Sequence, residues 1–157
     1  MLNVEHNFEV AAPIKDVWAY FANPSQVLPC LPGAELVETI NESTYRGRLG
    51  LRLGPISAQY LGTAEILETN HQDYRMTVHA RGDQQGVPGG AQAEIRFSLR
   101  EVAPEITEVK LEADVSITGK LAQIGGGMIQ SVSKFMFERF SRCVQETLES
   151  PRTETVS

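Results

Sequence analysis

A strictly alternating segment runs directly into a long apolar helical stripe near the C-terminus, and this junction constrains the fold more than any other feature of the sequence. From Thr107 to Ile117, apolar and polar side chains alternate with the period of two that is typical of a half-buried strand. After Gly119, apolar residues recur from Leu121 to Leu148 at the spacing of one helix face, over about seven turns. Such a stripe must be buried, and the preceding strands are the available partner. The sequence therefore predicts a sheet packed against one long C-terminal helix.

Alternation also predicts strands upstream of this junction. Short turns join most of these segments, which indicates an antiparallel meander rather than a parallel sheet and hence an α+β fold. After the first strand, helical spacing behind Pro13 predicts a helix over 13–21, and two prolines around Cys30 indicate a short helical turn within 25–33. The predicted strands, seven in all, cover residues 2–10, 34–40, 44–53, 56–66, 74–81, 91–100 and 107–117.

Length and charge describe an ordinary globular protein. The 157 residues fit one domain, which we expect to span residues 1–149 and to be followed by a polar, disordered tail over 150–157. Hydrophobic residues make up 41% of the chain and charged residues 22%, as in typical soluble domains. The net charge of -6 argues against non-specific binding to nucleic acid or to anionic lipid headgroups.

The sequence predicts neither a signal peptide nor a membrane-spanning segment. The chain passes from Met1 directly into an alternating strand, and no apolar run approaches the roughly 18 residues that a membrane-spanning helix needs. The two cysteines, Cys30 and Cys143, lie far apart and lack the spacing of a metal site. We therefore expect reduced thiols in a cytoplasmic protein and no bound metal.

Very small side chains occupy many inward positions of the predicted strands, and three consecutive glycines, Gly125–Gly127, fall within the predicted helix. Each glycine inside a helix costs roughly 1 kcal/mol relative to alanine. Two interpretations remain open: close packing of helix on sheet, or an internal cavity. We favour the cavity because the small residues are spread over several strands. They are Gly47, Ala58, Gly62, Ala64, Ala80, Ala91, Ala93 and Ala113.

A cavity between the sheet and the helix would have an apolar lining with a few hydroxyl groups, which suits a hydrophobic small molecule. Taken singly, each lining residue is also compatible with plain core packing. The candidate ligand-binding residues are Tyr45, Leu49, Leu51, Tyr60, Gly62, Tyr74, Met76, Phe97, Ile124, Gly125, Met128, Val132, Phe135 and Met136.

Catalytic motifs are absent from the sequence, which contains no GxSxG, HExxH, Walker loop or GxGxxG opening a helix. His6 is the one candidate acid or base, because alternation places it on the inner face of the first strand. A core histidine that hydrogen-bonds to a neighbour is the simpler interpretation. His71 and His79 are expected to be solvated. We therefore predict that the chain is not an enzyme.

Four arginines face outward on the predicted sheet. We interpret them as a solvated basic stripe, and a docking site for an acidic partner is the alternative. The glycine-rich stretch 82–90 predicts a loop that acts as a simple hairpin, a lid or an interaction surface. The arginines are Arg46, Arg48, Arg75 and Arg81.

Two short motifs stand out: Cys30-Leu31-Pro32-Gly33-Ala34, and Thr118-Gly119-Lys120-Leu121-Ala122-Gln123-Ile124-Gly125. With them, and with Ala12-Pro13, Val17-Trp18, Asn23-Pro24, Gly54-Pro55, Tyr60 and Gly62, the chain resembles the carbon monoxide dehydrogenase CoxG family of the START-like (SRPBCC) superfamily. The resemblance covers residues 1 to about 148. It implies a helix-grip fold, in which a curved antiparallel sheet of seven strands wraps a long C-terminal helix over a hydrophobic cavity, with one or two short helices after the first strand.

The resemblance also implies a function. Members of the family accompany molybdenum hydroxylases of the carbon monoxide dehydrogenase type and help to recruit them to the cytoplasmic membrane. We therefore expect a cytoplasmic accessory protein, at the inner face of the membrane, that binds a quinone or another lipid and carries no covalent cofactor. Many members have a long C-terminal extension suited to a membrane, whereas this sequence ends in a short polar segment.

Two alternatives remain open. The superfamily also includes cyclases and hydrolases, so the chain is alternatively an enzyme that acts on a hydrophobic substrate with His6 or a cavity tyrosine as acid or base. The third interpretation is a docking module whose arginine face binds an acidic partner. Fold alone does not decide among these functions.

Overall fold

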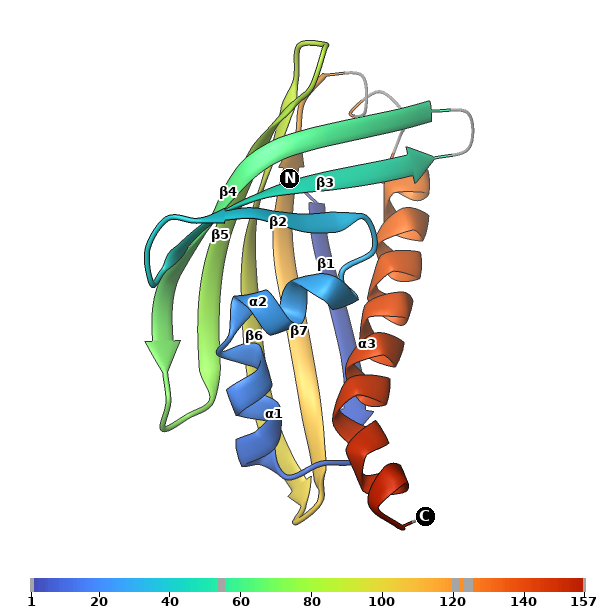
Figure 1. The fold of residues 1–157 in the computed structure, drawn as a ribbon. Coiled ribbons are helices and arrows are strands. Elements are labelled where there is room, and N and C mark those ends of the chain that lie inside the picture. The colour runs from blue at the N-terminus through green and yellow to red at the C-terminus, as the bar shows by residue number, and fades with distance from the viewer. Residues whose placement is uncertain (1, 54–55, 120–121, 123–125, 157) are drawn as a thin grey trace.

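Seven antiparallel strands curve around one long helix (Figure 1). The computed structural model describes residues 2–53, 56–119, 122 and 126–156. The strands are β1 (Leu2–Val10), β2 (Ala34–Thr39), β3 (Thr44–Leu53), β4 (Ile56–Asn70), β5 (Arg75–Gln84), β6 (Gly90–Ala103) and β7 (Ile106–Ile117). The helical elements are α1 (Ile14–Phe21), α2 (Pro24–Val27), the 3-10 turn η1 (Leu28–Cys30) and α3 (Gly126–Val156).

The strands form a single sheet in the order β1-β7-β6-β5-β4-β3-β2, and every neighbouring pair is antiparallel. The chain therefore crosses once from one edge to the other, through α1, α2 and η1, and otherwise runs as a meander. This arrangement confirms the predicted α+β class and the curved sheet around a C-terminal helix. The predicted strands are all present, and β4, β5 and β6 are longer than the alternation indicated.

Helix α3 begins later than the apolar stripe predicted. It starts at Gly126, so Gly126 and Gly127 lie in its first turn and Gly125 lies outside the described residues. Glycine is less costly there than in a helix interior, because the first backbone N–H groups have no intrahelical partner. At its other end the helix continues past Glu149 to Val156, so helical backbone extends into the segment predicted to be a disordered tail.

The main core lies between α1, the C-terminal half of α3 and the facing ends of β1, β6 and β7. Val10, Val109 and Val144 are fully buried in it, and Phe21 and Phe140 nearly so. One buried polar group is paired within it, since the Thr107 hydroxyl donates to the carbonyl oxygen of Ala12 at 2.8 Å. Helix and sheet are therefore packed closely at this end of the molecule.

A disulfide joins η1 to α3, with an S–S distance of 2.08 Å between Cys30 and Cys143. The expectation of two reduced thiols is therefore wrong for this structure. Local spacing could not reveal the pair, because 113 residues separate the two cysteines. They meet because the sheet returns α3 to the edge where the short helices pack.

Candidate ligand-binding site

Two cross-strand rows of small residues lie side by side on the concave face of the sheet, which is the face toward α3. The first row pairs Ala64 with Ala80 and Ala80 with Ala93, and Tyr45 and Val115 stand at its two ends. Directly opposed residues of antiparallel strands point to the same face, so these side chains are neighbours. In the second row, Gly47, Gly62, Gly82 and Ala91 pair in succession between Leu36 and Ile117.

We call these seven small residues of β3 to β6 the small-residue floor. All of them are only half-buried. Val109 and Leu111 on the same concave face, by contrast, are 0% and 2% exposed where α1 and α3 cover them. The floor is therefore not packed to the density of the main core. Its members are Gly47, Gly62, Ala64, Ala80, Gly82, Ala91 and Ala93.

Gly62 has a second reason to be small. A Cβ on Gly62 would collide with the carbonyl oxygen of Arg81 and would stand 2.6 Å from the Cα of Gly82, because β4 and β5 approach closely here. Since real Cβ atoms do not approach backbone this closely, only glycine fits at Gly62. Close backbone packing thus explains Gly62, whereas the three alanines of β4, β5 and β6 have no such constraint.

Two buried polar groups without partners border the floor. Tyr60 is 5% exposed, and neither its hydroxyl nor the Oε1 atom of Gln84 has a hydrogen-bond partner in the structure. Tyr60 and Gln84 are direct cross-strand partners, so both side chains point to the concave face. Burial raises the pKa of Tyr60, which keeps its hydroxyl protonated and able to donate. An unpaired buried polar group is costly, so this pair is a natural place for a polar atom of a guest.

His6 occupies the concave face at the opposite end of the floor, near the main core. Its ring stacks on Phe137 of α3, with centroids 5.5 Å apart, and its Nε2 atom is buried without a partner. Burial lowers the pKa of His6, and Glu138 opposes that shift. The prediction that alternation turns His6 inward is confirmed, but ring stacking takes the place of the hydrogen bond that was expected.

The predicted lining residues divide into groups. Tyr60, Leu49, Leu51 and Val132 pack together as one apolar cluster at the end of the floor where β3 and β4 meet α3. Tyr74, Met76 and Phe97 instead belong to the main core, where Trp18 and Phe21 contact Tyr74 and Phe97. The structure therefore brings four of these residues together beside Gly62 and places three at the other end.

The remaining predicted residues are more scattered. Tyr45 ends one row of the floor, but its hydroxyl donates to the carbonyl oxygen of Glu42 at 2.9 Å. Met136 is half-buried on α3, whereas Phe135 is 55% exposed and carries the guanidinium of Arg139 over its ring. Ile124 and Gly125 lie outside the described residues, as does the side chain of Met128.

Gln84 was missed as a candidate because its strand seemed to end before it. The glycine-rich stretch 82–90 suggests a loop, yet β5 continues to Gln84. Extending the period-two pattern of β5 by two residues past Gly82 would have placed Gln84 on the inner face.

His71 is not simply solvated. Its Nδ1 atom accepts a hydrogen bond from the indole Nε1 of Trp18 at 3.0 Å, and the two rings meet edge to face. This contact ties the turn between β4 and β5 to α1. His71 therefore has a structural role that the sequence did not suggest.

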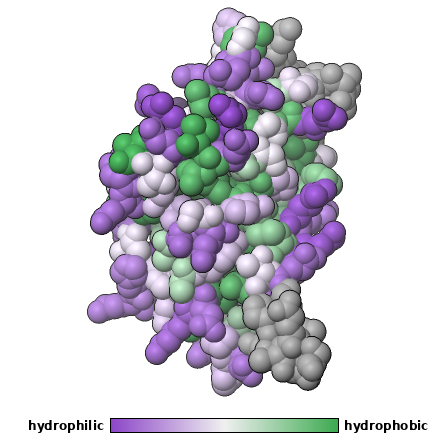
Figure 2. Space-filling model, viewed as in Figure 1, coloured by the Kyte–Doolittle hydropathy of each residue, from purple (hydrophilic) through white to green (hydrophobic). Residues whose placement is uncertain are grey.

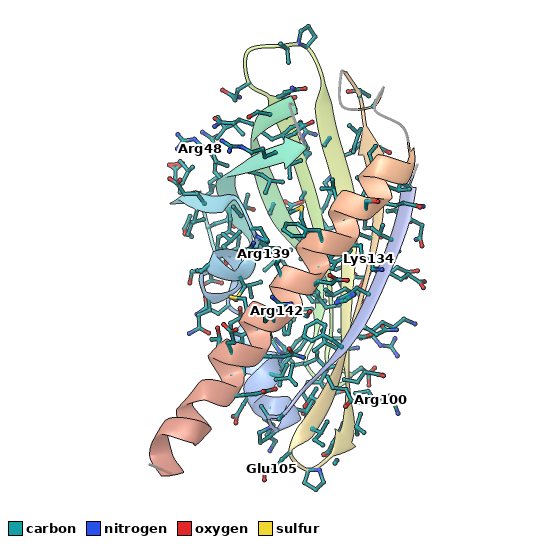
Figure 3. All side chains as sticks on the ribbon, turned by 90° about the vertical axis from the view of Figure 1, so that its right-hand side faces the viewer. Arg48, Arg100, Glu105, Lys134, Arg139 and Arg142 are labelled. Atoms are coloured by element: carbon teal, nitrogen blue, oxygen red, sulfur yellow. A yellow bond between two sulfur atoms is a disulfide. The ribbon has the colours of Figure 1, made fainter. Side chains whose placement is uncertain are left out.

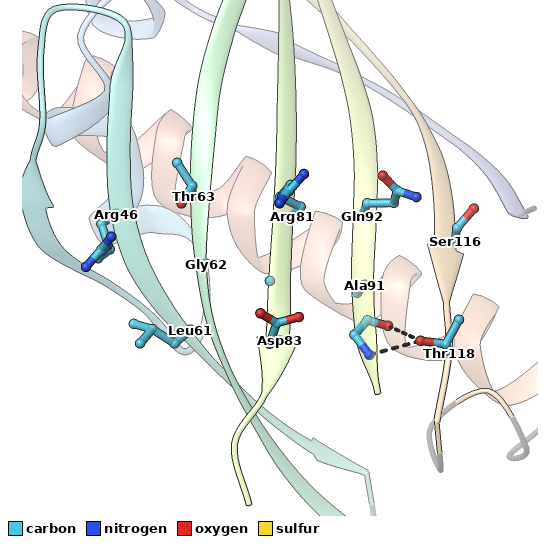
Figure 4. A pocket seen from close by; sticks show the side chains of 12 residues that line it. Arg46, Leu61, Gly62, Thr63, Arg81, Asp83, Ala91, Gln92, Ser116 and Thr118 are labelled. Carbon is cyan, nitrogen blue, oxygen red and sulfur yellow. Dashed lines mark hydrogen bonds between the residues drawn. The ribbon is translucent and has the colours of Figure 1, made fainter. Parts of the chain in front are cut away.

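Seen from the side of β2 and α1, apolar side chains run along the middle of the molecule between the strands and α3 (Figure 2). The opposite, convex face carries a polar groove of about 550 Å³ that Arg46 and Arg81 help to line (Figure 4). Within the described residues, no helix is long and apolar enough to cross a membrane.

The fold is shared with solved structures of low sequence identity. A conserved protein from Geobacillus kaustophilus aligns with a TM-score of 0.85 and 24% identity, over 95% of this chain and 96% of its own. A START superfamily protein from Mycobacterium smegmatis aligns with a TM-score of 0.63 and 17% identity, over 94% and 97%. The ZhuI aromatase/cyclase from Streptomyces sp. R1128 aligns with a TM-score of 0.60 and 14% identity, over 99% and 96%.

These likenesses establish a START-like fold, as the resemblance implied. No curated protein matches the chain. The carbon monoxide dehydrogenase CoxG family model, however, matches residues 7–149, which is nearly the whole sequence. The chain therefore belongs to the carbon monoxide dehydrogenase CoxG family.

Proposed function

We propose that this protein is a non-enzymatic accessory protein of a molybdenum hydroxylase of the carbon monoxide dehydrogenase type, and that it binds a quinone or another lipid between the sheet and α3. Family and fold both support a hydrophobic-ligand-binding role. The observation that carries the proposal is the Tyr60–Gln84 pair, whose unpartnered polar atoms border a floor that is not fully packed. A quinone offers carbonyl oxygens to the tyrosine and an apolar ring and tail to the alanines.

The first experiment identifies a bound molecule. Freshly purified protein is extracted with organic solvent, and the extract is analysed by mass spectrometry for a stoichiometric quinone or lipid. In parallel, quenching of Trp18 fluorescence by decylubiquinone measures whether binding saturates. An empty protein that also shows no saturable quinone binding contradicts the proposal.

Variants locate the ligand. We expect Ala80→Leu and Ala93→Leu to weaken quinone binding, because each adds three carbons above the floor. Ala19→Leu is the matched control, since Ala19 is exposed on α1 and the same carbons are added to the surface. Equal binding by all three variants would place the ligand elsewhere.

We also propose that the protein links the enzyme to the inner face of the cytoplasmic membrane. Support comes from α3, where exposed Phe135 lies beside the cations Lys134 and Arg139, with Arg142 farther along (Figure 3). An exposed aromatic ring flanked by cations suits the interface of an anionic bilayer. Sedimentation with vesicles containing phosphatidylglycerol should pull down the wild type more than Phe135→Ser, and neutral vesicles should pull down neither.

The second candidate function is a cyclase or hydrolase, which the buried and unpartnered Nε2 of His6 favours. A neutral imidazole with a free nitrogen is able to accept or donate a proton. Decylubiquinone recovered after incubation should be chemically unchanged if the protein is a carrier. A product that forms with the wild type and not with His6→Gln would instead establish an enzyme.

A further inference from the structure

Arginines on the convex face of the sheet fall into two classes. Arg96 is saturated by carboxylates: it pairs with Glu94, Glu112 and Asp114 at 3.0–3.2 Å. These contacts raise the pKa of Arg96 and lower the pKa of Asp114. Arg46 and Arg81 are exposed on the same face, and in the described part of the chain neither makes an ion pair.

The two unpaired arginines lie in one cross-strand row. Arg46 pairs with Thr63, Thr63 with Arg81, and the row continues through Gln92 to Ser116. Neighbouring strands are about 4.8 Å apart, so the two arginine backbones stand roughly 10 Å from each other. Every side chain of this row can donate a hydrogen bond and none is acidic.

The row lies in the convex groove of about 550 Å³, which we call the arginine groove (Figure 4). One wall is held in place by Thr118, whose hydroxyl accepts from the N–H of Gly90 at 3.0 Å. Among the described residues, Asp83 is the one carboxylate that lines the groove, at the side of the row toward Thr118. Donors thus predominate along the row, and a single carboxylate marks one side.

We propose that the arginine groove docks an acidic segment of a partner protein, with two carboxylates about 10 Å apart reaching Arg46 and Arg81. Charge complementarity selects this occupant, because two guanidinium groups with no internal partner favour carboxylates that bind both N–H donors at once. Such a contact is solvent-exposed, so it contributes mostly to encounter rate and specificity and weakens with salt. It is separate from the site for the hydrophobic ligand, which lies on the other face of the sheet.

The test uses a fluorescein-labelled peptide of alternating glutamate and serine, followed by fluorescence anisotropy with the full-length protein. We expect Arg46→Glu/Arg81→Glu to weaken binding at least about tenfold, which corresponds to about 1.4 kcal/mol. Arg52→Glu/Arg75→Glu is the matched control, because both of its arginines are exposed on the same sheet and the net charge changes equally. It should change the Kd less than about threefold, since exposed charges outside the groove act only through the screened field. Asp83→Asn should tighten binding.

Three results would overturn the proposal: no peptide binding by the wild type in low salt, equal loss in both double variants, or equal binding of the corresponding lysine–serine peptide. Displacement of the peptide by inorganic phosphate at matched concentration of charge would show a general anion site and would also overturn it. Thermal melts of both double variants verify folding, which exposed substitutions rarely disturb. Quinone binding should be the same in every variant, so failure of docking is distinguishable from failure of the proposed function.

Discussion

Cys30 of η1 and Cys143 of α3 are joined by a disulfide that encloses the six strands from β2 to β7 in one covalent loop. Cys30 is 5% exposed, and its sulfur lies 3.9 Å from the hydroxyl of Thr147. The bond therefore connects the short helices at one edge of the sheet to the helix that the sheet surrounds. Its main physical effect is on the unfolded chain, whose freedom it restricts.

We expect removal of this bond to lower the free energy of unfolding by about 2–5 kcal/mol, because the loop is long. Urea unfolding of the wild type is compared with and without a reducing agent, and with Cys30→Ser/Cys143→Ser. The double variant should be insensitive to the reducing agent. Equal stability of oxidised and reduced wild type would show that the bond does not constrain the unfolded chain.

Acid should destabilise the protein through His6. Burial lowers its pKa in the folded state below the ordinary value of 6.5, so the unfolded chain binds a proton more readily. Stability that is present above pH 6.5 is therefore lost as the pH falls through the folded pKa. The unfolding free energy of His6→Phe should fall less than that of the wild type over this range, whereas His79→Gln, which keeps His6, should follow the wild type. Parallel curves for His6→Phe and the wild type would contradict this role.

Alkali should destabilise the protein through Tyr20. Its hydroxyl is buried without a partner, and burial raises its pKa to about 12. The unfolded tyrosine ionises near pH 10, so stability present below that value is lost as the pH rises through about 12. Tyr20→Phe should flatten this loss and should be no less stable near neutral pH, because it removes an unpaired hydroxyl. Urea unfolding from neutral to alkaline pH measures both effects, and a variant clearly weaker at neutral pH would contradict them.

Gly62 should not tolerate a side chain. An added methyl group would meet the backbone of Arg81 and Gly82, which cannot move without separating β4 from β5. We expect Gly62→Ala to cost about 1–3 kcal/mol of unfolding free energy. Gly50→Ala is the control, since its nearest atom would lie 3.9 Å away and the residue is exposed in β3. Similar thermal stability of the two variants would show that the strands can shift.

Local patterns predicted the elements of this fold well. Alternation in residues 107–117 and the stripe that follows Gly119 correspond to β7 and α3, because each period is set by backbone geometry within one segment. The same rule was too coarse for one residue of the site. Buried or half-buried positions in α3 follow Val132, Met136, Phe140 and Val144 four residues apart, so Phe135 lies about 100° away from Met136 and faces solvent.

The sequence by itself determined which segments are strands and helices, which side of each strand is apolar, and the family to which the chain is similar, because these depend on neighbours along the chain. Only the tertiary structure decided which distant residues meet. Strand register aligned Ala64, Ala80 and Ala93 into one row, set Tyr60 opposite Gln84, and placed Arg46 and Arg81 in one groove. Register and helix docking depend on contacts between segments far apart in sequence, and no local periodicity records them.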